Sequence, residues 1–222
     1  MRESFSQRLR READGIWQRI FAHPFLAELQ AGSLPLAKFR YYVTQDYHYI
    51  EGFARVVAIA LAKAPDSSTM QALHRRVFTP VERPFHQRLL ALLEMSEEEV
   101  AAAPLSPTST AYVNHMLAAA SLGGLGEAAA ALLPCPWTYH EIGQRLAATA
   151  DNIPEAVYRE WAKPYAEGLL AESTAAWREF LDQAAAEAGP RQRERLAEVF
   201  LTSSRYEYLF WEMAYRVEEW PV

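Results

Sequence analysis

The sequence contains one thiol, Cys135, which lies between Pro134 and Pro136 in the stretch LLPCPWTYHEIG. A lone cysteine is usually an inert, buried packing residue, and that interpretation stays open here. The two prolines should break or kink the surrounding helix, because proline lacks an N–H and clashes with the preceding turn. Cys135 would then lie in the first turn of a new helix. Free backbone N–H groups and the positive end of the helix dipole favour a nucleophilic thiolate there.

Two carboxylates, Asp46 and Glu207, interrupt otherwise apolar helical stripes. Burying an ionised carboxylate without a partner costs several kcal/mol. Pairing with a cation, or capping a neighbouring helix, is the alternative explanation, but no inward arginine or lysine is evident. We therefore expect a polar pocket at the centre of a helical bundle. The two stripes, read at spacings of three and four, are Phe39, Tyr42, Asp46, Tyr49, Phe53, Val56 and Ala60, and Leu196, Phe200, Ser203, Glu207, Phe210, Ala214 and Val217.

Two further helical stripes place polar groups on apolar faces. Tyr112 precedes Met116 and Ala119 at helical spacing, and Tyr139 follows Cys135 by one turn. Most aromatic residues of the chain are expected to pack in the core. Inward tyrosines could instead line a pocket for a flat ring.

A metal site is not expected. Glu82 and His86 are four residues apart, a spacing that can chelate, but a di-iron bundle needs Glu-x-x-His motifs on two helices. No second such motif occurs, so Glu82 and His86 are expected to pair with each other or with a neighbouring element. The glycines of SLGGLGE follow no strand, and no Gly-x-Ser-x-Gly motif is present.

The elements that must position these residues are predicted to be helices nearly throughout, because helix formers dominate and glycine and proline lie mostly at segment borders. No alternating β-branched run predicts a sheet. With no linker long enough to divide it, the chain is expected to form a single helical domain over residues 1–222. The predicted helices are 4–21, 24–31, 35–64, 67–94, 107–121, 125–149, 155–165, 168–188 and 190–218.

Composition excludes several functional classes. Of the 222 residues 50% are hydrophobic, which is enough to bury a sizeable core. A net charge of −6 without a lysine or arginine block gives no indication of a nucleic-acid partner. No apolar run reaches the roughly 18 residues of a membrane span, and the charged N-terminus has no signal-peptide core. One cysteine cannot form an internal disulfide, which favours a cytoplasmic location.

Five motifs then carry a family resemblance. In chain order they are HPFLAELQAGSLPLAKFRYYVTQDYHYI, AYVNHMLAAA, LLPCPWTYHEIG, WAKPY and SSRYEYLFWEMAY. Together they resemble the TenA family, the thiaminase II or aminopyrimidine aminohydrolase group, from His23 to about Tyr215. The resemblance implies an all-α, haem-oxygenase-like helical bundle that is commonly a homotetramer. It implies no metal and no organic cofactor.

The resemblance also assigns roles in the Cys-containing subgroup. Cys135 is implied as the nucleophile and Glu207 as the proton donor. The Gln-Asp-x-x-Tyr motif implies that Asp46 binds the pyrimidine amino group and that Tyr49 raises the nucleophilicity of the thiol. The other implied substrate-binding residues are Tyr112, Tyr139, Tyr165 and Phe210.

The implied activity is hydrolysis of 4-amino-5-aminomethyl-2-methylpyrimidine, with thiamine as an alternative substrate, to the hydroxymethylpyrimidine in thiamine salvage. A carboxylic acid kept neutral by burial can protonate the ring, which makes it electrophilic towards a thiolate. The group on the exocyclic methylene leaves, water adds, and the thiolate departs. Two other readings stay open: a non-catalytic pyrimidine-binding or regulatory protein on the same fold, and a redox enzyme of the same architecture.

Overall fold

The computed structural model describes residues 3–78 and 83–222, and of residues 75–78 and 83 only the backbone. Throughout these ranges the regular structure is helical and no strand is present, so the all-α prediction is confirmed. The elements are α1 (Phe5–Glu12), α2 (Asp14–Phe21), α3 (Pro24–Ala31), α4 (Leu36–Ala62), α5 (Ser67–Phe78), α6 (Arg83–Leu92), α7 (Glu97–Ala102), α8 (Pro107–Leu122), α9 (Leu125–Leu132), α10 (Pro134–Leu146), the 3₁₀ turn η1 (Ala150–Asn152), α11 (Ala156–Ala166), α12 (Ala171–Glu187) and α13 (Pro190–Arg216).

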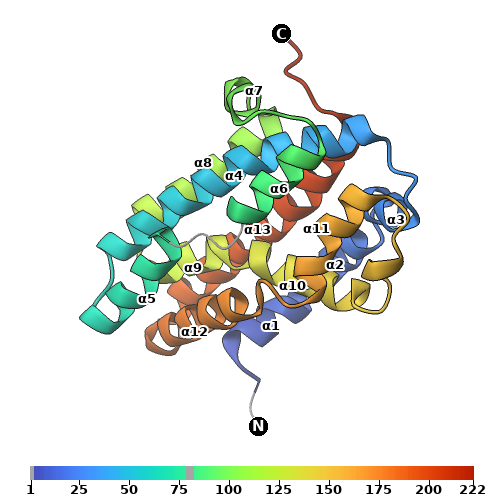
Figure 1. Ribbon diagram of the computed structural model, residues 1–222. Helices are drawn as coiled ribbons and strands as arrows, with labels where there is room; N and C mark the ends of the chain where they lie inside the picture. Colours follow the sequence, from blue (N-terminus) through green and yellow to red (C-terminus); the bar gives the residue numbers. More distant parts are fainter. Residues whose placement is uncertain (1–2, 79–82) are drawn as a thin grey trace.

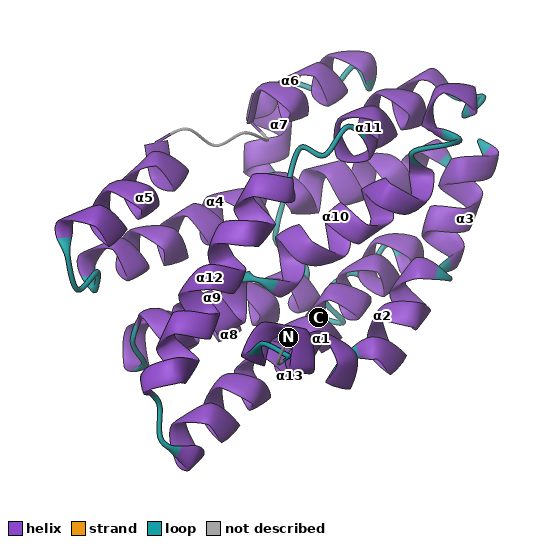
Figure 2. Ribbon diagram, turned by 90° about the horizontal axis from the view of Figure 1, so that it is seen from below, coloured by secondary structure: helices purple, strands orange, loops and turns teal. Residues whose placement is uncertain are grey.

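Two 27-residue helices, α4 and α13, form the centre of the bundle together with α8. In Figure 1 these three helices run along the same diagonal of the molecule. The shorter α9 packs against α8, α13 and α12, and α10 packs against α11 and α13. Figure 2, seen from below, shows α10 beside α11 and α12 lying against α9. Residues from the middle of α4, α8, α10 and α13 can therefore meet inside the bundle.

Several predicted boundaries are wrong. The range 4–21 is two helices, because the hydrogen-bonded run of α1 ends at Ala13, where ψ is −4°. Within the range 67–94 the described residues form α5, which runs to Phe78, and α6, from Arg83 to Leu92, and residues 79–82 lie outside the described part. The short helix α7 was not predicted. Its Ser96 and Glu99 form a capping box, a signal that is readable in the sequence. The other single-helix ranges agree with the structure to within three residues at each end.

Aromatic rings fill the core between α3, α4, α11 and α13. Tyr42 of α4 stacks on Trp211 of α13 with ring centroids 5.3 Å apart and planes 8° apart. Phe25 and Trp161 pack around the same tyrosine. Buried aromatic pairs of this kind add stability beyond the area they remove from water. This rigid cluster adjoins the polar groups at the centre of the bundle.

A glycine allows α10 and α11 to pack closely. A Cβ atom on Gly143 would lie 2.0 Å from the carbonyl oxygen of Tyr165, so no side chain fits there. Tyr165 is thereby held against α10, the helix that carries Cys135.

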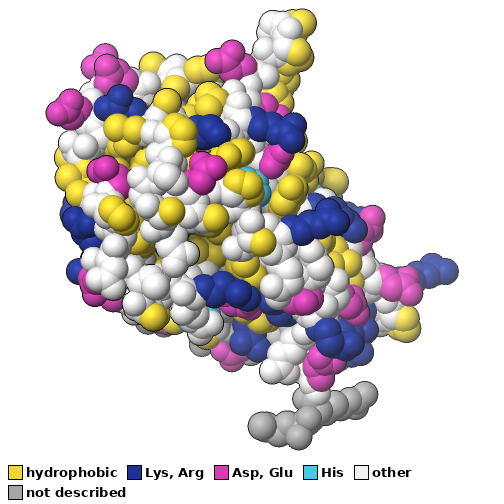
Figure 3. Space-filling view, turned by 90° about the vertical axis from the view of Figure 1, so that its right-hand side faces the viewer, with side chains coloured by type: hydrophobic (Ala, Val, Ile, Leu, Met, Phe, Trp, Pro, Cys, Tyr) yellow, Lys and Arg dark blue, Asp and Glu magenta, His cyan; other side chains and the backbone are white. Residues whose placement is uncertain are grey.

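Charged side chains of both signs are mixed on the surface face in Figure 3, with apolar atoms between them. Among the described helices, none is long and apolar enough to span a membrane.

Candidate active site

Cys135 is the second residue of α10, which begins at Pro134. The expected interruption of the helix is confirmed, because α9 ends at Leu132 and α10 begins at Pro134, with Leu133 as the residue between them. Leu133, between them, keeps helical dihedral angles of −59° and −37°. The interruption therefore lies in the hydrogen bonding, since proline at 134 and 136 supplies no N–H to the carbonyls four residues earlier. The thiol is half-buried.

The first turn of α10 offers fewer backbone donors than the sequence suggested. Pro134 and Pro136 carry no N–H, and the N–H of Trp137 donates to the carbonyl of Leu133 over 3.2 Å. Among these residues only Cys135 itself has a further N–H. The expectation of several free donors beside the thiol is therefore wrong, and the thiolate form stays a prediction.

Glu207 lies in the middle of α13 and is only 3% exposed. Tyr112 of α8 donates its O–H to Oε1 of this carboxyl group over 2.6 Å. Thr138 of α10 places its Oγ1 3.1 Å from Oε2. Side chains from two other helices thus fix both oxygens of Glu207. A carboxyl group held in this way can keep or release a proton at a defined position.

Tyr49 of α4 and Tyr112 of α8 lie next to each other, with ring centroids 5.1 Å apart. Burial raises the pKa of Tyr49 well above its ordinary value, and the charges of Cys135, Tyr112 and Glu207 raise it further. Burial, followed by the charges of Glu207 and Cys135, does the same to the pKa of Tyr112. Both phenols therefore keep their protons near neutral pH. Cys135 and Glu207 are linked by geometry, since Oγ1 of Thr138 contacts both Oε2 of Glu207 and the backbone carbonyl of Cys135.

Asp46 of α4 forms a buried pair with His86 of α6. Nε2 of the imidazole lies 2.7 Å from Oδ2 of the carboxylate, and the two residues are 3% and 6% exposed. The expected pairing of His86 with a neighbouring element is confirmed, whereas Glu82 lies outside the described residues. A carboxylate has several acceptor positions, so Asp46 retains capacity for a donor such as an amino group.

Tyr139 follows Cys135 by one turn and points into the same region. Its hydroxyl lies 2.9 Å from that of Tyr42, which accepts a hydrogen bond from the indole N–H of Trp161. Burial raises the pKa of Tyr139 well above its ordinary value, and the charges of neighbouring groups, Asp46 among them, add to the effect. Its phenol is therefore neutral and anchored to the aromatic core.

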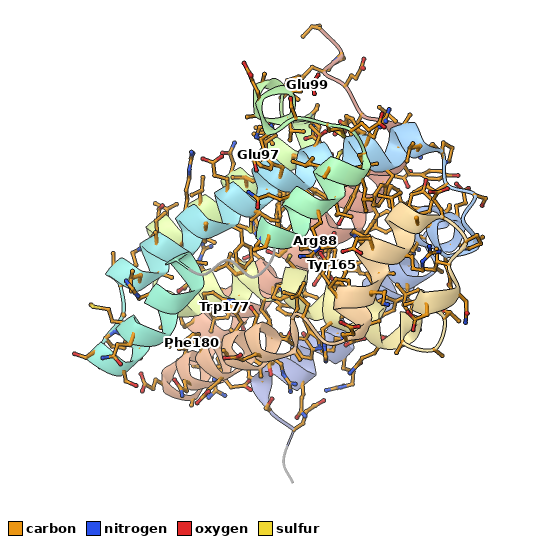
Figure 4. All side chains as sticks on the ribbon, viewed as in Figure 1. Arg88, Glu97, Glu99, Tyr165, Trp177 and Phe180 are labelled. Atoms are coloured by element: carbon orange, nitrogen blue, oxygen red, sulfur yellow. The ribbon has the colours of Figure 1, made fainter. Side chains whose placement is uncertain are left out.

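Tyr165 and Phe210 complete the aromatic lining. The ring of Tyr165 lies 5.2 Å from that of Tyr139, and Phe210 lies 5.5 Å from Tyr49. Tyr165, labelled in Figure 4, meets the ring of Phe85 of α6 edge-on with centroids 5.6 Å apart, where α6 and α11 pack together. There Arg88 forms a salt bridge to Glu160 over 2.9 Å. The α6 helix thus covers Tyr165 and also brings His86 to Asp46.

The structure brings the sequence-predicted site residues together from five helices, through the contacts given above. They are Asp46 and Tyr49 of α4, Tyr112 of α8, Cys135 and Tyr139 of α10, Tyr165 of α11, and Glu207 and Phe210 of α13. In the part of the chain whose side chains are described, no three histidine, cysteine, aspartate or glutamate residues form a metal-holding group.

Three polar residues of this region were not assigned to the site from the sequence: Thr138, Tyr42 and His86. Thr138 could have been found, since it lies on the helix of Cys135 three residues on and hence on the same side. Tyr42 was counted on the inward stripe only as packing. His86 had no sequence signal linking it to Asp46, because their pairing depends on how α6 folds over α4.

The fold places the protein among haem-oxygenase-like helical bundles. A solved domain with a heme oxygenase-like fold from Shewanella denitrificans superimposes with a TM-score of 0.75. The match covers 95% of this chain and 91% of that chain at 14% identity, which establishes the fold alone.

The family follows from the sequence comparison. The model of the TENA/THI-4/PQQC family matches residues 10–217, and the chain belongs to this family. A relative named aminopyrimidine aminohydrolase from Bacillus subtilis is 36% identical over 97% of this chain and 92% of its own length. A solved TenA homologue from P. horikoshii OT3 is 34% identical, with a TM-score of 0.86 over 96% of this chain and 99% of that chain.

Proposed function

We propose that this chain is an aminopyrimidine aminohydrolase of the thiaminase II type that acts in thiamine salvage. Family membership and the near-full-length similarity to the Bacillus subtilis enzyme support the activity. One structural observation carries the assignment of the site. The buried carboxyl group of Glu207 is held by Tyr112 and by Thr138, and Thr138 also contacts the carbonyl of Cys135. A single side chain thus links the proposed proton donor to the backbone of the residue that carries the proposed nucleophile.

The substrate we propose is 4-amino-5-aminomethyl-2-methylpyrimidine, with thiamine as an alternative. Asp46, oriented by His86, accepts a hydrogen bond from the 4-amino group. The rings of Tyr49, Tyr139, Tyr165 and Phe210 surround the flat heterocycle. Neutral phenols suit this task, because they contact an uncharged ring without placing an unpaired charge beside it.

In the first stage the Glu207 carboxyl group protonates a ring nitrogen of the substrate. The protonated ring becomes electrophilic, and the Cys135 thiolate forms a C–S bond to a ring carbon. The bond between the exocyclic methylene and its protonated amino group then breaks, and ammonia leaves with the electron pair of that bond. With thiamine the thiazole leaves instead.

In the second stage water adds to the exocyclic methylene of the enzyme-bound intermediate. Water gives up one proton to solvent as its oxygen bonds the methylene. The C–S bond breaks, the ring nitrogen returns its proton to the Glu207 carboxylate, and the thiolate of Cys135 is restored as 4-amino-5-hydroxymethyl-2-methylpyrimidine forms. Tyr112 donates to Glu207 throughout, so the carboxylate left after proton transfer stays hydrogen-bonded. Every step uses side chains of this chain and water.

Turnover of the purified protein tests the proposal. The wild type should release ammonia and hydroxymethylpyrimidine in equal amounts, measured enzymatically and by chromatography. Cys135→Ala should lose at least about 100-fold in kcat, because covalent catalysis is removed. Wild-type protein that makes no product would contradict the proposal. Tight pyrimidine binding in calorimetry without turnover would favour a binding or regulatory protein instead.

The proposed organisation is one helical domain over residues 1–222, assembled as a homotetramer and located in the cytoplasm. The assembly is what the resemblance to the TenA family implies, and the single cysteine of the chain favours the location. Light scattering of the purified chain tests the assembly, and a mass close to four times 25.2 kDa is the expected result.

A further inference from the structure

We propose that Thr138 is a positioning residue for the proton donor Glu207. Its hydroxyl group changes orientation when that carboxyl group gains or loses its proton. This inference rests on the proposed function and adds to it a residue that the family motif does not assign. It is carried by the geometry of one side chain that contacts both the Glu207 carboxyl group and the backbone of Cys135.

Thr138 is fully buried, on the turn of α10 that follows Cys135. Its Oγ1 lies 3.1 Å from Oε2 of Glu207 and 3.1 Å from the backbone carbonyl of Cys135. Bonding to the carbonyl three residues earlier is a common threonine conformation in helices. The contact with Glu207 is different, because it reaches across to another helix, α13.

The hydroxyl group has one hydrogen and two acceptor positions. The carbonyl oxygen of Cys135 can only accept. When Glu207 holds its proton, Tyr112 already donates to Oε1, so the proton belongs on Oε2. Thr138 can accept that proton's hydrogen bond while donating its own hydrogen to the Cys135 carbonyl.

After Glu207 has given its proton to the substrate ring, Oε2 becomes a charged acceptor. The Thr138 hydroxyl then turns and donates to it, since hydrogen bonds to charged groups are the stronger ones. One side chain thus satisfies Oε2 before and after proton transfer. Because Thr138 is attached to the helix of the nucleophile, it also fixes the distance between the donor and the thiol.

Thr138→Val removes the hydroxyl group and keeps the shape. We expect kcat to fall about 10- to 100-fold, the effect of losing one hydrogen bond to a charged group. KM should change less than threefold, because Thr138 does not contact the ring in this scheme. Thr138→Ser restores the hydroxyl group and should recover at least a third of kcat.

Thr174→Val is the matched control. Thr174 is also buried and donates to a carbonyl in the first turn of α10, that of Pro136, over 3.0 Å. It makes no bond to Glu207 among its described contacts. The same chemical change is therefore made beside the same helix, and kcat should stay within threefold of the wild type.

A double-mutant cycle separates positioning from general structural damage. In the Glu207→Gln background, Thr138→Val should reduce the residual kcat by less than threefold, because the carboxyl group that Thr138 positions is absent. An equal loss in both backgrounds, or a Thr138→Val enzyme with more than half of the wild-type kcat, overturns the inference. So does a failure of Thr138→Ser to recover activity while the protein is folded by circular dichroism.

An activity-independent readout keeps this inference distinct from the proposed function. Infrared difference spectra against Glu207→Gln identify the carboxyl band of Glu207. Thr138→Val should move that band and Thr174→Val should leave it in place. An unmoved band overturns the inference even in an active enzyme, whereas an inactive wild type with a moved band contradicts only the proposed function.

Discussion

Nε2 of His86 lies 2.7 Å from Oδ2 of Asp46, and both side chains are buried. The two residues are 40 positions apart and come from α6 and α4. The histidine supplies the partner that a buried carboxylate requires. It also holds that carboxylate in one orientation, and in the proposed function this gives α6 a direct role in substrate recognition.

Replacing His86 by leucine should therefore weaken substrate binding. Removing one partner of a buried pair costs about 3 kcal/mol or more, part of it as stability and part as a misplaced Asp46. We expect KM for the aminopyrimidine to rise at least tenfold and kcat to change less. Steady-state kinetics measures both constants. His74→Asn, at an exposed position of α5, is the control and should leave KM unchanged. A wild-type KM in folded His86→Leu would show that the pair does not orient Asp46.

Stability should decline as the pH falls below about 6.5, partly because of His23. Its Nδ1 accepts the N–H of Phe25 at the start of α3, and its Nε2 binds Glu212. Burial lowers the pKa of His23 from 6.5, and it outweighs the opposing effect of Glu212. The unfolded chain then binds a proton more readily than the folded one. The histidine's contribution is therefore fully present above about pH 6.5 and is lost as the pH falls. His115, whose pKa burial also lowers, acts in the same direction.

His23→Asn tests this linkage, because asparagine caps a helix and does not titrate. Denaturant unfolding at pH 7.5, 6.5 and 5.5 should show a smaller loss of stability in the variant than in the wild type. The His74→Asn protein should follow the wild-type curve. Identical pH dependence in His23→Asn and wild type would rule out His23 as a source of the effect.

Gly143→Ala should destabilise the protein by driving α10 and α11 apart. The added Cβ would meet the Tyr165 carbonyl oxygen at 2.0 Å, and its three nearest atoms, from Tyr165 and Ala166, all belong to the backbone. Overpacking of this kind costs about 3 kcal/mol or more, which corresponds to a drop in Tm of roughly 6–12 °C for a chain of this size. Gly15→Ala is the control, since a Cβ there meets nothing within 4 Å. It lies inside α2 and should raise Tm slightly. Equal melting temperatures for the two variants would contradict the close approach of α10 and α11.

Much of the fold could be predicted because its signals are local. Apolar spacing at three and four residues predicted α4 and α13 and placed Asp46 and Glu207 on their buried faces. Proline and glycine predicted the interruption at Pro134 and the start of α13 at Pro190. These features depend on a few neighbouring residues and on the geometry of one helix.

The rest depends on contacts between distant segments. The break at Ala13 has no proline beside it, and the pairing of His86 with Asp46 exists only once α6 has packed over α4. The number of free donors beside Cys135 was misjudged for a different reason. A proline in the first turn removes donors as well as interrupting the helix, and both prolines here lie in that turn.

The central claim, that Cys135 and Glu207 act on one pyrimidine ring, is tested most directly by a crystal structure of the complex with 4-amino-5-hydroxymethyl-2-methylpyrimidine. We predict that Sγ of Cys135 lies within about 3.5 Å of a ring carbon and that the Glu207 carboxyl group is within about 3 Å of a ring nitrogen. Asp46 should contact the amino group in the same complex. A ring bound away from Cys135, or with Glu207 facing no ring nitrogen, would contradict the account.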